Sequence, residues 1–158
     1  MTRARRLAAW LYATAGLTCL ADRITKLWAE RSLAGRPPVT VIPSVLQLNY
    51  TTNSGGAFGL GQSASWVFAA ATIVVAAAIV ASSFRLRNGH AAVALGLILG
   101  GAFGNLTDRA ARGDGLLSGR VVDFIDFRVW PVFNLADSAI VIGALLLAVA
   151  GIRREREA

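Results

Sequence analysis

The sequence predicts an all-α integral membrane protein with four transmembrane helices and a small extracytoplasmic sheet. Three observations support this fold class. Of the 158 residues, 55% are hydrophobic and only 16% are charged, whereas about a quarter of the residues in a soluble domain are charged. The apolar residues gather in four long stretches. The charged residues lie between these stretches or at their ends, where a chain leaves the hydrocarbon core of a bilayer.

The four predicted transmembrane helices comprise residues 7–28, 66–84, 91–109 and 133–152 of a single membrane domain. They leave residues 29–65 and 110–132 as long extracytoplasmic loops. About 20 helical residues cross a hydrocarbon core of roughly 30 Å. The second and fourth stretches reach that length easily. The first and third reach it only by including Asp22 and Asp108, so we expect the polar residues to stand where the helices leave the membrane.

The first stretch has a second interpretation, because basic residues before an apolar run are also typical of a cleaved secretory signal peptide. Cys19 near its end is also compatible with a lipoprotein attachment site. Three further spans follow, which favours an uncleaved first helix in which Cys19 is a packing residue. A single cysteine excludes an internal disulfide, and the single histidine, His90, cannot form a zinc site unaided.

The arrangement of basic residues predicts the orientation. Eight arginines fall within about twenty residues around both termini and the short turn between the second and third stretches. Eight other basic residues are spread over the opposite side. We therefore expect both termini in the cytoplasm. Despite a net charge of +7, nucleic acid is disfavoured as a partner, because the arginines separate apolar runs and form no single patch with aromatics.

The long loops are not plain linkers. Residues 39–41 and 46–51 alternate apolar and polar side chains, a pattern that predicts short strands. The second loop sets acids among large apolar residues at positions 121–127. Trp28, Trp66 and Trp130 stand near the same membrane level, as in an aromatic belt. We expect a small sheet over the outer membrane face.

Two acids are the candidates for chemistry. Asp137 lies in the first turns of the fourth helix, and Asp123 lies fourteen residues earlier between Val122 and Phe124. Carboxyls near an apolar zone are costly and often functional. If they meet, one keeps its proton while the other acts as a base, and the pair can activate a water against an amide. The alternative is that Asp137 only caps its helix.

Polar partners lie at the same ends of the first and third helices. Asn105 and Arg109 are four residues apart and share a helix face, as do Asp22 and Lys26. Lys26 is the one lysine beside fifteen arginines, which favours a role for its compact ammonium group. The alternatives are a structural ion pair between Asp108 and Arg109, and a lysine that snorkels by chance.

These residues lie in motifs that resemble the lipoprotein signal peptidase (signal peptidase II) family. The resemblance covers nearly the whole chain, in order. Its motifs are DRITK at residues 22–26, NSGGAFG at 53–59, GGAFGNLTDR at 100–109, VVDF at 121–124 and FNLADS at 133–138.

The resemblance implies an aspartyl endopeptidase of the bacterial inner membrane with four transmembrane helices and an outward β-cradle. It implies cleavage of prolipoproteins just before the diacylglyceryl-modified cysteine, with membrane lipid as a further partner, no cofactor, and cyclic peptide inhibitors such as globomycin. Asp123 and Asp137 would be the catalytic pair. The resemblance further implies residues that line or order the substrate groove (Asn53, Gly55, Asn105, Arg109 and Asn134) and residues that support the site (Asp22 and Lys26).

Two other classes remain open from the residues alone. A small polytopic transporter or proton channel also places polar residues inside a bundle, although it is expected to carry them near mid-membrane. A non-catalytic membrane scaffold is the other alternative, and it would tolerate the loss of either acid.

Overall fold

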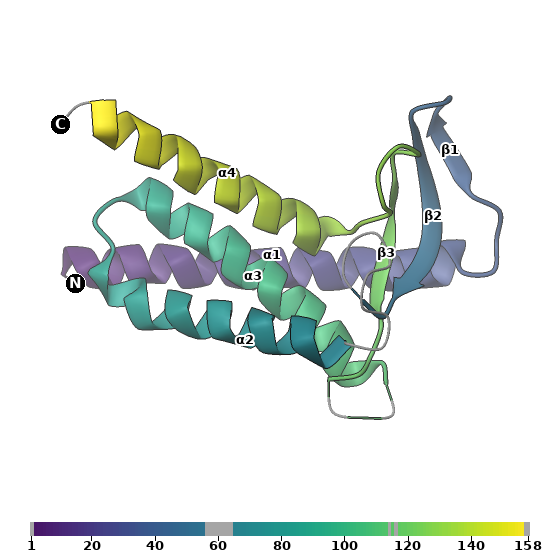
Figure 1. Cartoon of the computed structure of the whole chain (residues 1–158), viewed down its shortest axis with the longest axis horizontal. Helices are drawn as coiled ribbons and strands as arrows, with labels where there is room; N and C mark the ends of the chain where they lie inside the picture. Colours follow the sequence, from purple (N-terminus) through teal and green to yellow (C-terminus); the bar gives the residue numbers. More distant parts are fainter. Residues whose placement is uncertain (1, 56–64, 114, 116, 157–158) are drawn as a thin grey trace.

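The computed structural model describes residues 2–55, 65–113, 115 and 117–156. Within these residues four helices run side by side, and a three-stranded sheet covers one end of them (Figure 1). Both termini lie at the end opposite the sheet (Figure 1). The helices are α1 (Arg3–Leu33), α2 (Ser65–Ser82), α3 (Gly89–Ala111) and α4 (Leu135–Arg156), with a 3₁₀ turn, η2 (Ser83–Arg85), after α2.

The ends of the helices follow from local sequence signals. α1 begins after Thr2, whose hydroxyl accepts a hydrogen bond from the Arg5 amide. It continues to Leu33, beyond the predicted boundary at residue 28, and so projects over the sheet. α4 begins at Leu135 and not at residue 133, because Asn134 Oδ1 accepts from the Asp137 amide at 2.9 Å and caps the helix.

Helix α3 is the centre of the bundle, and it packs against α1, α2 and α4. Glycines allow this close approach. A Cβ at Gly100 would lie 2.6 Å from Thr18 Cβ of α1, and a Cβ at Gly101 would lie 2.8 Å from Ile140 Cγ1 of α4. The apolar core between α1, α2 and α3 includes Leu11, Ile79 and Leu99.

The sheet is antiparallel with the order β1-β2-β3, formed by β1 (Val39–Ile42), β2 (Leu46–Asn53) and β3 (Val121–Asp126). β1 and β2 match the two alternating segments of the sequence. β3 was not predicted as a strand, because it is buried on both faces and therefore lacks alternation. Phe124 of β3 packs with Ala29 and Leu33 of α1, which fixes the sheet to the projecting end of that helix.

Two helical segments, Ser65–Arg85 and Gly89–Ala111, are long and apolar enough to cross a bilayer, and Leu135–Ala150 is a shorter apolar segment. Large apolar side chains are exposed on the outer surfaces of the bundle, among them Leu17, Val74 and Leu145. A soluble protein rarely exposes so much contiguous apolar surface. The fold is therefore mostly helical, with an apolar exterior and a polar, sheet-covered end.

Candidate active site

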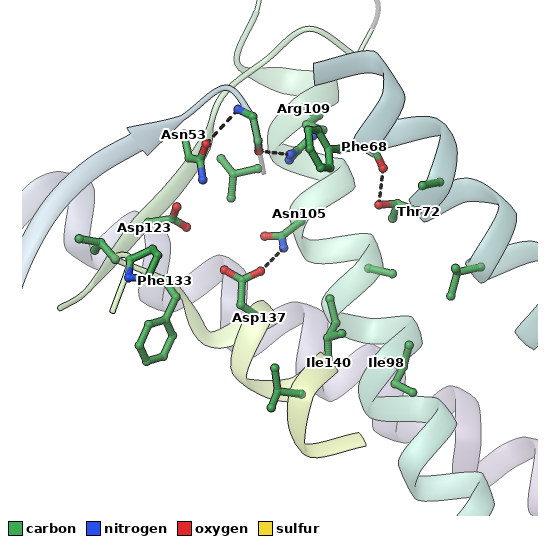
Figure 2. Close-up of a pocket in the computed structure, with 18 of the residues that line it drawn as sticks. Asn53, Phe68, Thr72, Ile98, Asn105, Arg109, Asp123, Phe133, Asp137 and Ile140 are labelled. Atoms are coloured by element: carbon green, nitrogen blue, oxygen red, sulfur yellow. Dashed lines mark hydrogen bonds between the residues drawn. The ribbon is translucent and has the colours of Figure 1, made fainter. Parts of the chain in front are cut away.

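A pocket of about 520 Å³ opens where α2, α3 and α4 meet the sheet (Figure 2). Both candidate acids, Asp123 and Asp137, line it. Its polar end also holds Asn53, Asn105 and Arg109, and Figure 2 shows their side chains converging there. The rest of the wall is mainly apolar and includes Phe68, Ala71, Val75, Ile98, Ala102, Phe133, Ile140 and Val141. Polar chemistry and an apolar trough thus share one cavity.

Backbone pairing brings the two acids together. Asp123 is held in β3 opposite Thr51 of β2. The chain then turns back, and Phe133 pairs with Ile125 of β3 through amide-to-carbonyl bonds of 2.9 Å and 3.0 Å. Residue 133 directly precedes the cap of α4, so Asp137 in the first turn of that helix enters the same pocket.

Asn134 links the two carboxyls directly. Its Nδ2 donates to Asp123 Oδ1 at 2.6 Å, and its backbone amide donates to Asp137 Oδ2 at 3.4 Å. Asn105 Nδ2 donates to the other oxygen of Asp137, Oδ1, at 2.7 Å (Figure 2). Amide donors therefore orient both acids. Two carboxyls that act on the same water need such fixed orientations.

The environment of Asp123 favours its protonated form. The residue is 2% exposed, and burial, followed by the nearby charge of Asp137, raises the pKa of Asp123 to about 7. Hydrogen bonds from Asn134 and Asn53 oppose this rise. By contrast, Asp126 on the same strand lies outside the pocket, and a hydrogen bond from Gln47 lowers its pKa. The direction of the pKa shift thus distinguishes Asp123, in the pocket, from Asp126, which lies on the same strand outside it.

Arg109 brings a positive charge into the wall of the pocket. It is 7% exposed, and its Nη2 donates to the Gly55 carbonyl at 3.1 Å (Figure 2). Its charge interacts with Asp137 and Asp123. Its Nε has no hydrogen-bond partner among the described residues, although it is buried. Gly55 is held in turn by Asn53 Oδ1 at 2.9 Å. Residues 56–59 of the same sequence motif lie outside the described residues.

A buried ion network lies behind the pocket. The Lys26 side chain is fully buried, with Nζ 2.8 Å from Asp22 Oδ2 and 2.9 Å from Asp108 Oδ2, so it is not a snorkelling lysine. The alternative of an ion pair between Asp108 and Arg109 is not what the described residues show. Asp108 pairs with Lys26, Arg23 and Arg112, because adjacent helical residues point about 100° apart.

The structure therefore brings Asn53, Gly55, Asn105, Arg109, Asp123, Asn134 and Asp137 to one pocket or its hydrogen bonds, with Asp22 and Lys26 directly behind it. Sequence analysis missed the contribution of α2, whose Phe68, Thr72 and Val75 line the pocket. An apolar helix without ionisable residues carries no signal for this role. It also missed the ion pair of Arg112 with Glu30, at 2.8 Å.

Among the described residues, no group of three or more histidine, cysteine or acidic side chains is placed to hold a metal.

Known proteins show the same sequence features and the same fold. The sequence model of the signal peptidase (SPase) II family matches residues 14–153. A lipoprotein signal peptidase of Rhodococcus jostii is 40% identical over 149 residues, which cover 94% of this chain and 74% of the relative. Those of Desulfitobacterium hafniense and Syntrophomonas wolfei are 39% and 43% identical, covering 93% and 90% of this chain and 95% of each relative.

Two solved structures, both described as a bacterial membrane enzyme determined by the in meso method, share the fold. One has a TM-score of 0.77 and 29% identity over 90% of this chain and 87% of that chain. The other has a TM-score of 0.75 and 31% identity over 89% of this chain and 90% of that chain.

Proposed function

The chain belongs to the signal peptidase II family, and from this premise we propose that Asp123 and Asp137 are the catalytic pair with which it cuts its substrates. As a member of that family it is a membrane-embedded aspartic peptidase that removes signal peptides from prolipoproteins. One observation carries the proposal: two carboxyls from separate elements line one pocket and are joined through the same Asn134 side chain and amide.

The chemistry follows from unequal acids. With the pKa of Asp123 raised to about 7, the pair holds one shared proton at slightly acidic pH and still holds it in about half of the molecules at pH 7. The ionised carboxylate takes a proton from a water, whose oxygen attacks the scissile carbonyl carbon. The protonated acid donates to the carbonyl oxygen. When the C–N bond breaks, the proton taken from water passes to the departing nitrogen.

The shape of the pocket suits a lipid-modified substrate. Its apolar wall, formed by residues such as Phe68, Val75 and Ile140, suits the acyl chains of a diacylglyceryl cysteine or apolar signal-peptide residues. The scissile bond then lies at the polar end, before the modified cysteine. The same pocket is where a cyclic peptide inhibitor such as globomycin would bind.

The remaining polar residues hold the substrate or the acids. Arg109 has a buried Nε–H without a partner among the described residues, and this group would donate to a substrate oxygen. Asn53, with Gly55, orders the strand end beside the pocket. Asn105 and Asn134 orient the acids. Asp22 and Lys26, which the sequence resemblance groups with these residues, support the site from behind.

The proposal includes the arrangement in the membrane. All four helices would span the bacterial inner membrane, with both termini in the cytoplasm and the pocket toward the outer face. The polar site at the sheet-covered end (Figure 1) and the arginines at the opposite end are the observations that support this orientation.

The test is cleavage of a diacylglyceryl-modified precursor by purified protein in detergent. We expect Asp123→Asn and Asp137→Asn to lower kcat by at least about a thousandfold, because each removes a proton carrier but keeps an oxygen for the existing amide donors. Thermal melting checks that both variants remain folded. An unlipidated precursor tests the need for the lipid.

Asp126→Asn is the matched control. Asp126 lies three residues from Asp123 on the same strand, but its side chain bonds Gln47 outside the pocket. This variant should keep kcat within about threefold, as is usual for a polar change away from the reacting groups. Full activity in either Asp123→Asn or Asp137→Asn would show that the two acids are not the catalytic pair.

A further inference from the structure

The ammonium group of Lys26 makes two ion pairs and one hydrogen bond. Its Nζ lies 2.8 Å from Asp22 Oδ2, 2.9 Å from Asp108 Oδ2 and 2.9 Å from Asn105 Oδ1. The side chain is 0% exposed. The first two contacts belong to the ion network, and the third reaches the layer of side chains that touches the catalytic pair.

The contact with Asn105 fixes which way its amide points. An ammonium group only donates, so the oxygen end of the amide must face Lys26. Asn134 Nδ2 donates to the same oxygen at 3.2 Å. The nitrogen end therefore faces Asp137, where it donates to Oδ1 at 2.7 Å. The other oxygen of Asp137, Oδ2, faces a second N–H donor, the Asn134 backbone amide at 3.4 Å. Because neither nitrogen can accept, neither oxygen carries a proton at these contacts.

We propose that Lys26 is a positioning residue that makes Asp137 the base of the pair. By fixing the amide orientation of Asn105, it keeps a donor on Asp137, so that Asp137 is the proton acceptor of the pair and Asp123 carries the shared proton. This inference rests on the proposed function of the two acids. It goes further because it assigns the two proton-transfer roles and places their cause on α1, a helix that contributes no residue to the pocket wall.

The charges around Asp123 and Asp137 are balanced if the two acids together hold one proton. Behind the pocket, three cations (Lys26, Arg23 and Arg112) meet three carboxylates (Asp22, Asp108 and Glu30) in contacts of 2.8–3.4 Å. This network is neutral by itself. Outside this network, the charge of Arg109 on α3 interacts with Asp137 of α4, then Asp123 of β3, then Asp108. A pair with one proton carries one negative charge, which matches the single positive charge of Arg109.

The assignment gives each proton a path. The Asp137 carboxylate takes a proton from water as the water oxygen bonds to the carbonyl carbon, while Asp123 gives its proton to the carbonyl oxygen. When the intermediate collapses, the C–N bond breaks and Asp137 gives its proton to the nitrogen. One hydroxyl of the intermediate returns a proton to Asp123, so the enzyme ends as it began.

A double-mutant cycle tests whether Lys26 acts through Asn105. We expect Lys26→Met and Asn105→Ala each to lower kcat about 30-fold or more, with KM within about threefold, because both remove the oriented donor on Asp137. The double variant should be no slower than Asn105→Ala alone, since the two changes remove the same interaction. A merely structural lysine would instead give losses that multiply.

Arg23→Gln is the matched control. Arg23 is the next cation of the same network and pairs with Asp108 at 3.4 Å, but no contact joins it to Asn105 among the described residues. It should keep kcat within about threefold, because its side chain is 40% exposed and its ion pair is weak. Equal losses of kcat in Arg23→Gln and Lys26→Met would assign the effect to the network charge and overturn the proposal.

Lys26→Met leaves two buried carboxylates with one cation fewer, so its melting temperature is measured first. If it does not fold, the charge-neutral pair Asp22→Asn with Lys26→Met replaces it in the cycle. The substituted amide keeps an oxygen for the Ala136 amide, from which Asp22 Oδ1 now accepts at 2.9 Å. Failure of both to fold assigns Lys26 to folding and overturns the proposal. Inactive Asp123→Asn and Asp137→Asn in the same assay show that the catalytic pair stands regardless.

Discussion

At the scale of single residues, identical side chains acquire different properties from their surroundings. Asp123 and Asp126 lie on the same strand, yet burial and a neighbouring acid raise the pKa of Asp123 to about 7, whereas a hydrogen bond from Gln47 lowers the pKa of Asp126. The two residues have the same side chain and lie on the same strand, so their pKa values differ only because their surroundings differ. This difference makes protein stability depend on pH in a way that can be measured without substrate.

The stability of the protein should depend on Asp123 with a definite sign. Below the ordinary carboxyl pKa of 3.8, Asp123 is protonated in the folded and the unfolded chain. Between about pH 4 and pH 7 the unfolded chain ionises while the fold retains its proton, so this contribution to stability is lost as the pH rises. Asp123→Asn removes the titration, so its melting temperature relative to wild type should rise by roughly 10 °C between pH 4.5 and pH 8.

Asp126→Asn provides the opposite case. A lowered pKa contributes stability at neutral pH that is lost as the pH falls through the folded-state value. The melting temperature of this variant relative to wild type should therefore be lowest near neutral pH and should recover in acid. Differential scanning fluorimetry in detergent measures both effects if the series extends from pH 8 down to about pH 2.5, because the pKa of Asp126 in the fold lies below the ordinary value of 3.8. If the melting temperatures of Asp123→Asn and wild type change in parallel with pH, the environment of Asp123 does not raise its pKa, and the assignment is wrong.

At the scale of elements, α3 determines where the polar groups lie. Its glycines let α1 and α4 approach until Lys26 reaches Asn105 at 2.9 Å and Asn105 reaches Asp137 at 2.7 Å. These bonds cross between helices, so their lengths depend on the distance between helix axes. The hydrogen bonds of the site therefore require the close helix packing that these small residues allow.

Gly100→Ala should separate α1 from α3. The new Cβ would lie 2.6 Å from Thr18 Cβ and against the Ala15 carbonyl, which belongs to rigid helix backbone. Overpacking of this kind costs about 1–3 kcal/mol, so we expect a lower melting temperature and a lower kcat. Gly16→Ala on α1 is the control, because nothing lies within 4 Å of its Cβ. Equal melting temperatures for both variants would contradict the close packing of α1 and α3.

The elements also show what sequence patterns can and cannot predict. Long apolar runs predicted the four helices, and alternation of apolar and polar residues predicted β1 and β2. In each of these segments the environment of the side chains follows a simple pattern along the sequence. β3 was missed, since α1 covers one side of it at Phe124 and the pocket acid occupies its other side. A strand buried on both faces has no period to detect.

At the scale of the whole molecule, the candidate site could be predicted only in part. The motifs indicated Asp123, Asp137 and their amide partners, because the proposed chemistry requires these residue types and the motifs contain them. The pairing of Asp108 with Lys26, Arg23 and Arg112 was not predicted, and the role of Phe68 was missed. Both depend on which helices are neighbours and how they are rotated, and no single segment records that information.

The polarity of the whole molecule predicts its orientation in the membrane. The sheet and the loop after β3 lie at one end, and the arginine-bearing turn after α2 lies at the other (Figure 1). In a Cys19→Ser background, a cysteine replacing Val129, which is 92% exposed, should react with a membrane-impermeant maleimide added to intact spheroplasts. A cysteine replacing Arg85 should react only after the membrane is opened, because basic turns remain in the cytoplasm. Both variants should react fully in detergent, which controls for local exposure. Labelling of the Arg85 site in sealed spheroplasts, with Val129 protected, would reverse the topology and place the pocket on the side where no signal peptide emerges.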